Sequence, residues 1–133
     1  MTLSSMTSVS LSGMTAASRR LEASAANVAN VDTVGALPTD GAASSVHRAR
    51  TVALTEVAGG GVSAAVVEAS RGWVPRAAPG SPFADAAGLV AAPDVDLATE
   101  AVTQIGACLA YAASAKTMKV ADEMAKTALD TLA

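Results

Sequence analysis

Residues 23–35 read Ala-Ser-Ala-Ala-Asn-Val-Ala-Asn-Val-Asp-Thr-Val-Gly, and they end an amphipathic segment at the N-terminal end of the chain. Within that segment Met14, Leu21 and Val28 lie seven residues apart, which is the spacing of a coiled-coil seam. The flanking positions are filled by Leu11, Ala17, Ala25 and Val31. This pattern predicts a helix over residues 8–31.

A second long apolar pattern begins after Asp96, which is well placed to cap the N-terminus of a helix. Its apolar residues recur at steps of three and four: Leu97, Ala101, Val102, Ile105, Leu109, Ala112, Val120, Met124, Ala128 and Leu132. We expect a long C-terminal helix in which Gly106 permits a close helix crossing and Cys108 fills a small apolar space. The expected fold is mainly α, with long N- and C-terminal helices paired as an antiparallel coiled-coil-like hairpin.

A small β-hairpin and loop insertion is expected between the helices, in residues 34–93. This region holds most of the glycines and all five prolines. Residues 51–57 and 62–69 are rich in β-branched residues and are separated by Ala58-Gly59-Gly60-Gly61, which predicts a hairpin. The prolines that follow predict an extended, turning connection rather than a helix.

Composition limits how stable a single copy can be. Leu, Ile, Val and Phe make up only about a fifth of the chain, close to the level at which a stable core becomes doubtful. A lone copy is therefore expected to be marginal, so that assembly supplies the missing burial. The net charge of −3 without a basic stripe argues against nucleic acid as a partner. No apolar run approaches the roughly 18 residues that a membrane span needs.

No group of residues in the sequence predicts chemistry, and we expect no catalytic, cofactor-binding or metal site. His47 is the single histidine and is interpreted as a solvated loop residue. The run Gly59-Gly60-Gly61 lacks the Lys-Ser/Thr of a phosphate-binding loop and is better explained as a hairpin turn. Asp94 and Asp96 could form a carboxylate pair, but the cap of a helix is the simpler interpretation of one of them.

Three motifs stand out by their order and spacing. The first is Asn27-Val28-Ala29-Asn30 followed by Asp32-Thr33-Val34-Gly35, the second is residues 79–95 (PGSPFADAAGLVAAPDV), and the third is Ala110-Tyr111 within the C-terminal helix. They resemble, in that order, the Asn-Ile-Ala-Asn-x-x-Thr-x-Gly, Pro-Gly-His-Pro-x-Ala-Asp-x-x-Gly-Tyr-Val and Arg-Ala-Tyr-Gln-Ala-Asn motifs of the flagellar basal-body rod protein family. The second motif is typical of proximal-rod subunits. Leu109 stands where the family has arginine, so the chain resembles a divergent member.

The resemblance implies a structural subunit of the proximal rod, assembling through its terminal helices into the torque-transmitting axial structure. The implied partners are copies of itself, other rod subunits and the flagellar export apparatus, with no nucleic acid and no membrane insertion. The implied location is the periplasmic rod of the basal body, after export without a cleaved signal peptide. Residues 1–33 would be an export leader and a helix, residues 34–93 the insertion, and residues 94–133 the C-terminal helix of the same helical domain. The leader, residues 1–7, is expected to be non-helical.

The residues expected at the assembly interface belong to the two apolar seams and to the asparagine motif: Leu11, Met14, Leu21, Asn27, Val28, Asn30, Val102, Ile105, Leu109, Tyr111, Ala112, Val120 and Met124. The two asparagines are explained equally well by polarity near a helix end and by hydrogen bonds across a helix or subunit boundary. An alternative function is a small helical-hairpin adaptor or regulatory binding module, or a specialised paralogue of the rod subunit. A compact, folded monomer would favour the adaptor.

Overall fold

The computed structural model consists of two long helices and two small antiparallel sheets, and it describes residues 2–39, 45–70 and 72–132. Met1 of the predicted leader and residues 40–44 of the predicted insertion lie outside the described residues. The elements in chain order are α1 (Leu3–Asn30), β1 (Arg50–Glu56), β2 (Val62–Glu68), β3 (Val74–Ala77), β4 (Leu89–Ala92) and α2 (Leu97–Leu132). The prediction of a mainly helical chain with a β-hairpin insertion is confirmed.

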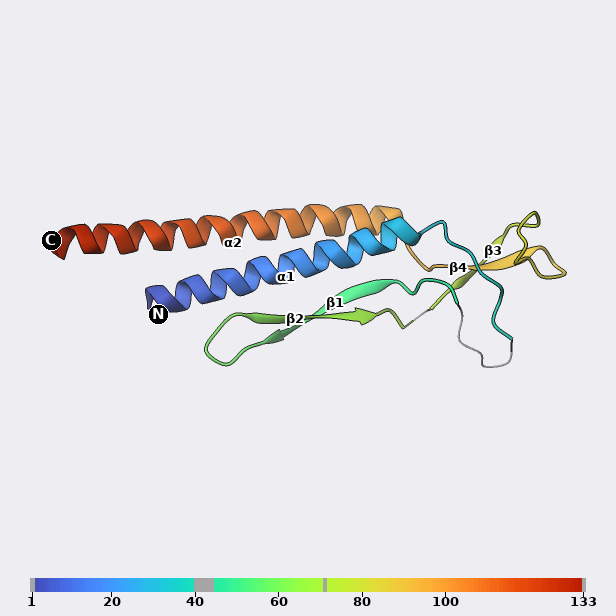
Figure 1. Cartoon of the computed structure of the whole chain (residues 1–133), viewed down its shortest axis with the longest axis horizontal. Coiled ribbons are helices and arrows are strands. Elements are labelled where there is room, and N and C mark those ends of the chain that lie inside the picture. The colour runs from blue at the N-terminus through green and yellow to red at the C-terminus, as the bar shows by residue number, and fades with distance from the viewer. Residues whose placement is uncertain (1, 40–44, 71, 133) are drawn as a thin grey trace.

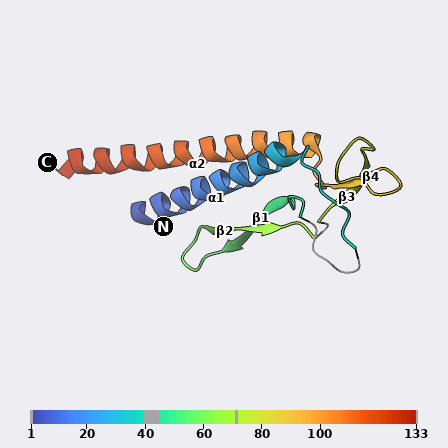
Figure 2. The same ribbon diagram turned by 45° about the vertical axis from the view of Figure 1, so that its right-hand side comes forward.

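The elements form three layers with α1 in the middle (Figures 1 and 2). α2 lies beside α1 and runs in the opposite direction, while the β1–β2 hairpin lies along the other side of α1 (Figure 1). The β3–β4 sheet lies beyond the end at which α1 finishes and α2 begins (Figure 1). The molecule is therefore long and thin, and α1 contacts both of the other layers.

α1 begins earlier than the sequence predicts. The Thr2 side chain caps the helix by accepting a hydrogen bond from the Ser5 backbone N–H at 3.2 Å. The hydroxyls of Ser5 and Thr7 donate to carbonyls of the preceding turn, at 2.7 and 2.9 Å. The prediction that residues 1–7 are non-helical is therefore wrong for the described part of that segment, because hydroxyl residues and a cap support the first turns without an apolar period.

The start of α2 confirms the predicted cap. The Asp96 carboxylate accepts hydrogen bonds from the backbone N–H groups of Ala98 and Thr99, at 3.2 and 3.3 Å, and from the Thr99 hydroxyl at 2.6 Å. Because these bonds favour the charged carboxylate, with the Thr99 hydroxyl as the largest cause, the pKa of Asp96 is lowered.

Small residues pack α1 against α2. The buried residues of α1 are Ser10, Ala16, Ala17, Ala23, Ser24 and Asn27, and those of α2 are Ala107 and Ala121. Ser10, Ala17 and Ser24 follow one another at seven-residue steps, and Ala107 and Ala121 are two such steps apart. Short side chains at this spacing form a continuous stripe that allows the two helices to approach closely.

The predicted seam of Met14, Leu21 and Val28 lies at the edge of the contact between the two helices, with Met14 half-buried and Leu21 lining a groove beside α2. Leu21 is 40% exposed and Val28 is 36% exposed, and both lie beside the small-residue stripe rather than within it. The prediction of the packed face of α1 was therefore wrong. Small residues occupy the closest part of the contact, because large ones would hold the helices apart.

Gly13, rather than Gly106, lies at a close approach of the helices. A Cβ atom at Gly13 would lie 2.7 Å from Oγ of Ser114 on α2, which is nearer than side chains normally come. A Cβ at Gly106 would meet nothing within 4 Å, so the expectation that Gly106 permits a close crossing was wrong.

The tip of the β1–β2 hairpin is attached to α1. Gly59, Gly60 and Gly61 have φ of 96°, 99° and 94°, which confirms the predicted glycine turn. The Val62 backbone N–H donates to the Ser12 hydroxyl at 3.2 Å, and a Cβ at Gly61 would lie 2.5 Å from that same oxygen. The tip can therefore dock on α1 only with glycine at position 61.

The β3–β4 sheet was predicted only as an extended, turning connection. Its strands are four residues long, and the sheet is joined to the segment after α1 by two backbone hydrogen bonds between Gly35 and Ala91, at 3.0 and 2.9 Å. The Arg76 side chain donates to the carbonyls of Val31 and Asp32, at 3.5 and 3.3 Å. These contacts hold the sheet at the end of the helix pair.

We expect Gly13→Leu to lower the thermal unfolding midpoint, because its side chain would push α1 away from Ser114 at a cost of about 1–3 kcal/mol. Gly106→Leu is the matched control and should leave the midpoint unchanged or raise it, because leucine has the higher helix propensity and position 106 is open. Circular dichroism at 222 nm measures both. Equal effects of the two substitutions would contradict the observed packing.

Candidate assembly surfaces

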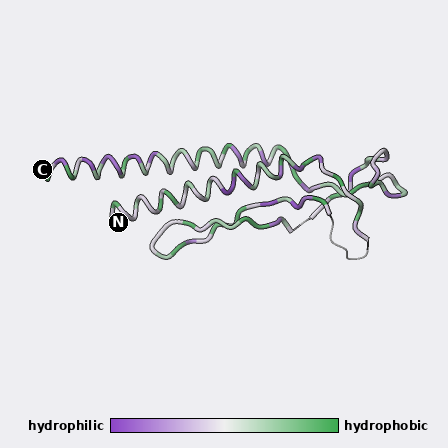
Figure 3. The backbone as a smooth tube through the Cα atoms, viewed as in Figure 1, coloured by the Kyte–Doolittle hydropathy of each residue, from purple (hydrophilic) through white to green (hydrophobic). Residues whose placement is uncertain are grey.

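The side of α2 that faces away from α1 carries large apolar residues. Val102, Ile105 and Leu109 are 70%, 62% and 67% exposed, although each is aliphatic. They follow one another at steps of three and four on the helix face opposite Ala107, which is buried against α1. Hydrophobic residues are spread along α2 and the hairpin rather than gathered in one centre (Figure 3).

Leu21 and Tyr111 are brought together by the helix pair. They line a groove of about 450 Å³ between α1 and α2, together with Ala17, Ser18, Ala107 and Cys108. Cys108 is exposed there, so the expectation that it fills an apolar space within the chain was wrong. Two predicted interface residues from different helices therefore share one surface.

The other apolar residues predicted at the interface lie apart from that groove. The exposed ones are Leu11, Val28, Ala112, Val120 and Met124, whereas Met14 is half-buried. Leu11 lines a shallow groove between α1 and β2, beside Val62 and Ala64.

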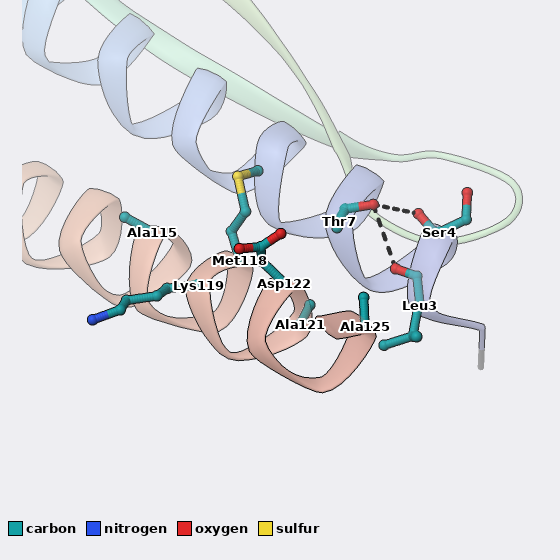
Figure 4. A pocket seen from close by; sticks show the side chains of 9 residues that line it. All are labelled: Leu3, Ser4, Thr7, Ala115, Met118, Lys119, Ala121, Asp122 and Ala125. Carbon is teal, nitrogen blue, oxygen red and sulfur yellow. Dashed lines mark hydrogen bonds between the residues drawn. The ribbon is translucent and has the colours of Figure 1, made fainter. Parts of the chain in front are cut away.

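A third groove lies between the first turns of α1 and the later turns of α2 (Figure 4). Leu3 and Thr7 line it from α1, and Met118, Ala121 and Ala125 are among the residues that line it from α2. The Thr7 hydroxyl is already bonded to the Ser4 carbonyl at 2.9 Å, as Figure 4 shows. The groove continues the small-residue contact between the helices.

Asn27 joins three elements and is 1% exposed. Its side-chain nitrogen donates to the Arg50 carbonyl at 2.8 Å and to Oε1 of Glu100 at 2.7 Å, and its oxygen accepts from the Arg50 N–H at 2.8 Å. The amide thus pairs with the first residue of β1 as a neighbouring strand would, while also binding α2. Of the two explanations for the asparagines, hydrogen bonding across a helix boundary holds for Asn27, within the chain.

Asn30 behaves differently from Asn27. Its side-chain nitrogen donates to the Ala26 carbonyl of its own helix at 2.8 Å. The explanation by polarity near a helix end therefore suffices for Asn30.

The sequence predicts a solvated His47, but the structure places its side chain half-buried beside Asn27. Its Nε2 lies 3.3 Å from Oδ1 of Asn27, and since that oxygen is an acceptor, Nε2 must carry the proton. Burial and the positive charge of Arg50 lower the pKa of His47, against a smaller raising effect of Glu68. His47 is therefore a neutral donor that supports the Asn27 cluster.

The remaining polar groups offer no chemical centre in the part of the chain that the structure describes. No group of three or more His, Cys, Asp or Glu residues there is placed to hold a metal ion. None of the described helices combines the length and the apolar character that crossing a membrane requires.

Sequence reasoning missed the residues that hold the layers together. Gly13, Ser24 and Ala107 escaped notice because small residues score weakly as hydrophobic. The repeat of small residues at seven-residue steps was the signal that could have identified them.

Asn27→Ala should loosen the hairpin from both helices, because it leaves the Arg50 N–H and carbonyl without these partners at a cost of about 1–3 kcal/mol for each buried group. Asn30→Ala is the matched control, since the Asn30 side chain donates to a carbonyl of its own helix. Urea unfolding and amide hydrogen exchange of β1 and β2 measure the difference. Equal protection in the two variants would show that Asn27 does not hold the hairpin.

Stability should also depend on pH through His47. Because its pKa in the folded chain lies below the ordinary 6.5, the unfolded chain binds the proton more readily. The contribution of His47 is complete above about pH 6.5 and is lost as the pH falls through the lowered value. The urea midpoint should therefore fall between about pH 7 and 5 more steeply in the natural chain than in His47→Gln. Parallel slopes would exclude this role.

Two segments of the chain match families of known proteins. Residues 8–36 match the family described as Flagella basal body rod protein, and residues 86–131 match that described as Flagellar basal body rod FlgEFG protein C-terminal. The first segment spans most of α1 and the asparagine motif, and the second spans β4 and nearly all of α2.

The chain is also similar to curated proteins over most of its length. It is 34% identical over 119 residues to the flagellar basal-body rod protein FlgC of Escherichia coli O6:H1, and equally to that of Escherichia coli O157:H7. Each comparison covers 85% of this chain and 85% of the relative. The chain therefore belongs to the flagellar basal-body rod protein family.

Proposed function

We propose that this chain, a structural subunit of the flagellar basal-body rod, assembles through the outward apolar faces of its two helices. The observation that carries the proposal is the position of the large aliphatic residues. Val102, Ile105 and Leu109 are mostly exposed, whereas the contact between the helices is made by small residues. A helix that is apolar on two opposite sides is stable in water only when both sides are covered.

The shape of the molecule supports assembly. Its accessible surface is 8487 Å², whereas a compact protein of this mass would expose about 6,300 Å². The additional surface lies along a thin stack of three layers (Figure 1). This shape disfavours the alternative of a compact adaptor, which would bury these side chains within its own fold.

The helix pair and the insertion have different roles in this proposal. Residues 1–33 and 94–133 form one helical domain whose seven-residue spacing is that of an antiparallel coiled-coil-like pair. Its neighbours are copies of itself and other rod subunits. Residues 34–93 support the helices and carry the motif of proximal-rod subunits.

The proximal-rod assignment rests on a motif with a structural role. Asp85 accepts hydrogen bonds from the backbone N–H groups of Ala87 and Leu89, at 2.9 and 2.8 Å, and Gly88 adopts a φ of 76°. The Asp-x-x-Gly part of the motif therefore forms the turn into β4. Delivery by the flagellar export apparatus to the periplasmic rod is also part of the proposal, because a thin chain with few large buried residues unfolds easily.

Deleting the gene should abolish swimming and leave basal bodies without a complete rod.

Leu109→Asp and Leu21→Asp should each remove the protein from purified basal bodies without stopping its export. A carboxylate at either position remains solvated in the free chain, but its burial in a subunit contact costs several kcal/mol, roughly 3 or more. Immunoblots of basal bodies and of cell fractions measure both effects.

Glu123→Gln is the control, since Glu123 lies on an exposed part of α2 and forms only a surface ion pair with Lys119. It should assemble at the natural level. Normal rods built from Leu109→Asp protein would show that this face of α2 stays in solvent.

A further inference from the structure

The outer face of the β1–β2 hairpin carries no charged residue. The register pairs Thr51 with Val67, Ala53 with Ala65 and Thr55 with Ser63, so these six residues share one face. Each of them is exposed. The half-buried strand residues Val52, Val62 and Ala64 belong to the other face, which is turned toward α1.

The distribution of charge on the hairpin is the reverse of the usual one. A sheet with one face on a protein core and one face in water normally carries its charges on the water side. Here Arg50, Glu56 and Glu68 all belong to the face turned toward α1, at the two ends of the strands. An outer face of threonine, alanine, serine and valine is therefore suited to contact with another protein surface.

The complementary surface is on the opposite side of the same molecule. The hairpin and α2 lie on opposite sides of α1 (Figures 1 and 2), and the outward side of α2 presents Val102, Ile105 and Leu109. One surface has protruding aliphatic side chains and the other has small ones. Large side chains packed on a small-residue face form a close contact.

The two surfaces also match along the length of the molecule. Asn27 holds Arg50 beside Glu100, so the root of the hairpin is level with the first turn of α2. At the other end Ser12 binds the hairpin tip and the adjacent Gly13 touches Ser114. The outer face of the hairpin therefore spans the same height as the apolar stretch of α2.

We propose that the outer face of the hairpin is the docking surface for α2 of a second copy of this chain. This inference rests on the proposed function, since it names the partner of the outward face of α2. The two surfaces differ and lie on opposite sides of the molecule, so the contact is heterologous. Each time a copy is added, the hairpin face at one end of the row and the α2 face at the other end stay uncovered. Such a contact builds an open array instead of closing on a dimer.

Cysteine cross-linking within basal bodies tests the inference. The variant carries Ala53→Cys and Ile105→Cys together with Cys108→Ser, which removes the natural exposed thiol. Within one chain α1 separates the two positions, so a disulfide, which needs Cα atoms within about 7 Å, cannot form there. Oxidation should give a ladder of dimers, trimers and longer species on denaturing gels, because every copy carries both surfaces.

The matched control replaces Ala53→Cys by Ala86→Cys, at an exposed loop position, and should give no ladder. If the test variant is present in basal bodies but gives only monomers, or cross-links only to a different rod protein, the inference is overturned. Absence of the natural protein from basal bodies would instead refute the proposed function, and this inference with it.

A second pair of variants covers the case in which the cysteine variant fails to assemble. Ala53→Asp should reduce incorporation into basal bodies about tenfold or more, because a carboxylate buried in the contact costs more than about 1.4 kcal/mol. Ala86→Asp should incorporate normally. Both positions are exposed in the single chain, and circular dichroism of the two purified variants checks that each still folds. Equal incorporation of the two variants would refute the docking surface.

Discussion

The close approach of α1 and α2 through small residues is the constraint on which the rest of the structure depends. Where Gly13 faces Ser114, a Cβ atom would lie 2.7 Å from the Ser114 hydroxyl, so a larger residue fits only if that side chain turns or a helix moves. The stripe of alanine and serine therefore occupies the inner faces of both helices, and the larger aliphatic residues are left on other faces. The exposed apolar surface of the chain is thus a consequence of how its own helices pack.

The second constraint is the attachment of the hairpin to α1 at two points. Asn27 binds the first residue of β1, and Ser12 binds the first residue of β2 at the tip. The 15 residues of α1 between these points span about 22 Å at the rise of an α-helix. A strand of 7 residues spans about 23 Å, so the hairpin fits the distance between its two attachments. The two attachments therefore keep the hairpin alongside α1, with one face turned outward.

Much of the fold could be predicted from the sequence, because period and turn chemistry are local properties. The Asp96 cap and the glycine turn each act over a few residues, and each was predicted correctly. The packed face of α1 could not be read in the same way. Hydrophobicity ranks Leu21 above Ala17, whereas the helix contact selects side chains by size. The Asn27 cluster also escaped prediction, because its partners Arg50 and Glu100 are far away in sequence.

The residues expected at the assembly interface remain a prediction about contacts between subunits. Leu21 and Leu109 were expected at the assembly interface, as central residues of the two apolar seams. Leu109 lies on the outward side of α2, whereas Leu21 lines the groove between α1 and α2. The sequence could not separate the two possibilities, because a residue that packs within a chain and one that packs between chains leave the same periodic pattern. Only the three-dimensional arrangement shows which apolar face is already used and which is left for a partner.

Small residues make the contact between the two helices, whereas large aliphatic residues remain exposed on α2, and this difference links folding to assembly. A side chain such as Ile105 contributes about 1.5–3 kcal/mol when it is fully buried. Three of them together are comparable with the whole stability of a marginal domain. While those residues remain in water, the contacts within the chain are mostly between alanines, serines and glycines, which bury little area. We expect a subunit built in this way to unfold easily as a single copy and to gain most of its hydrophobic stabilisation when a neighbour covers it. Under the proposed assembly, the helix packing that leaves these aliphatic residues exposed would therefore favour the assembled state.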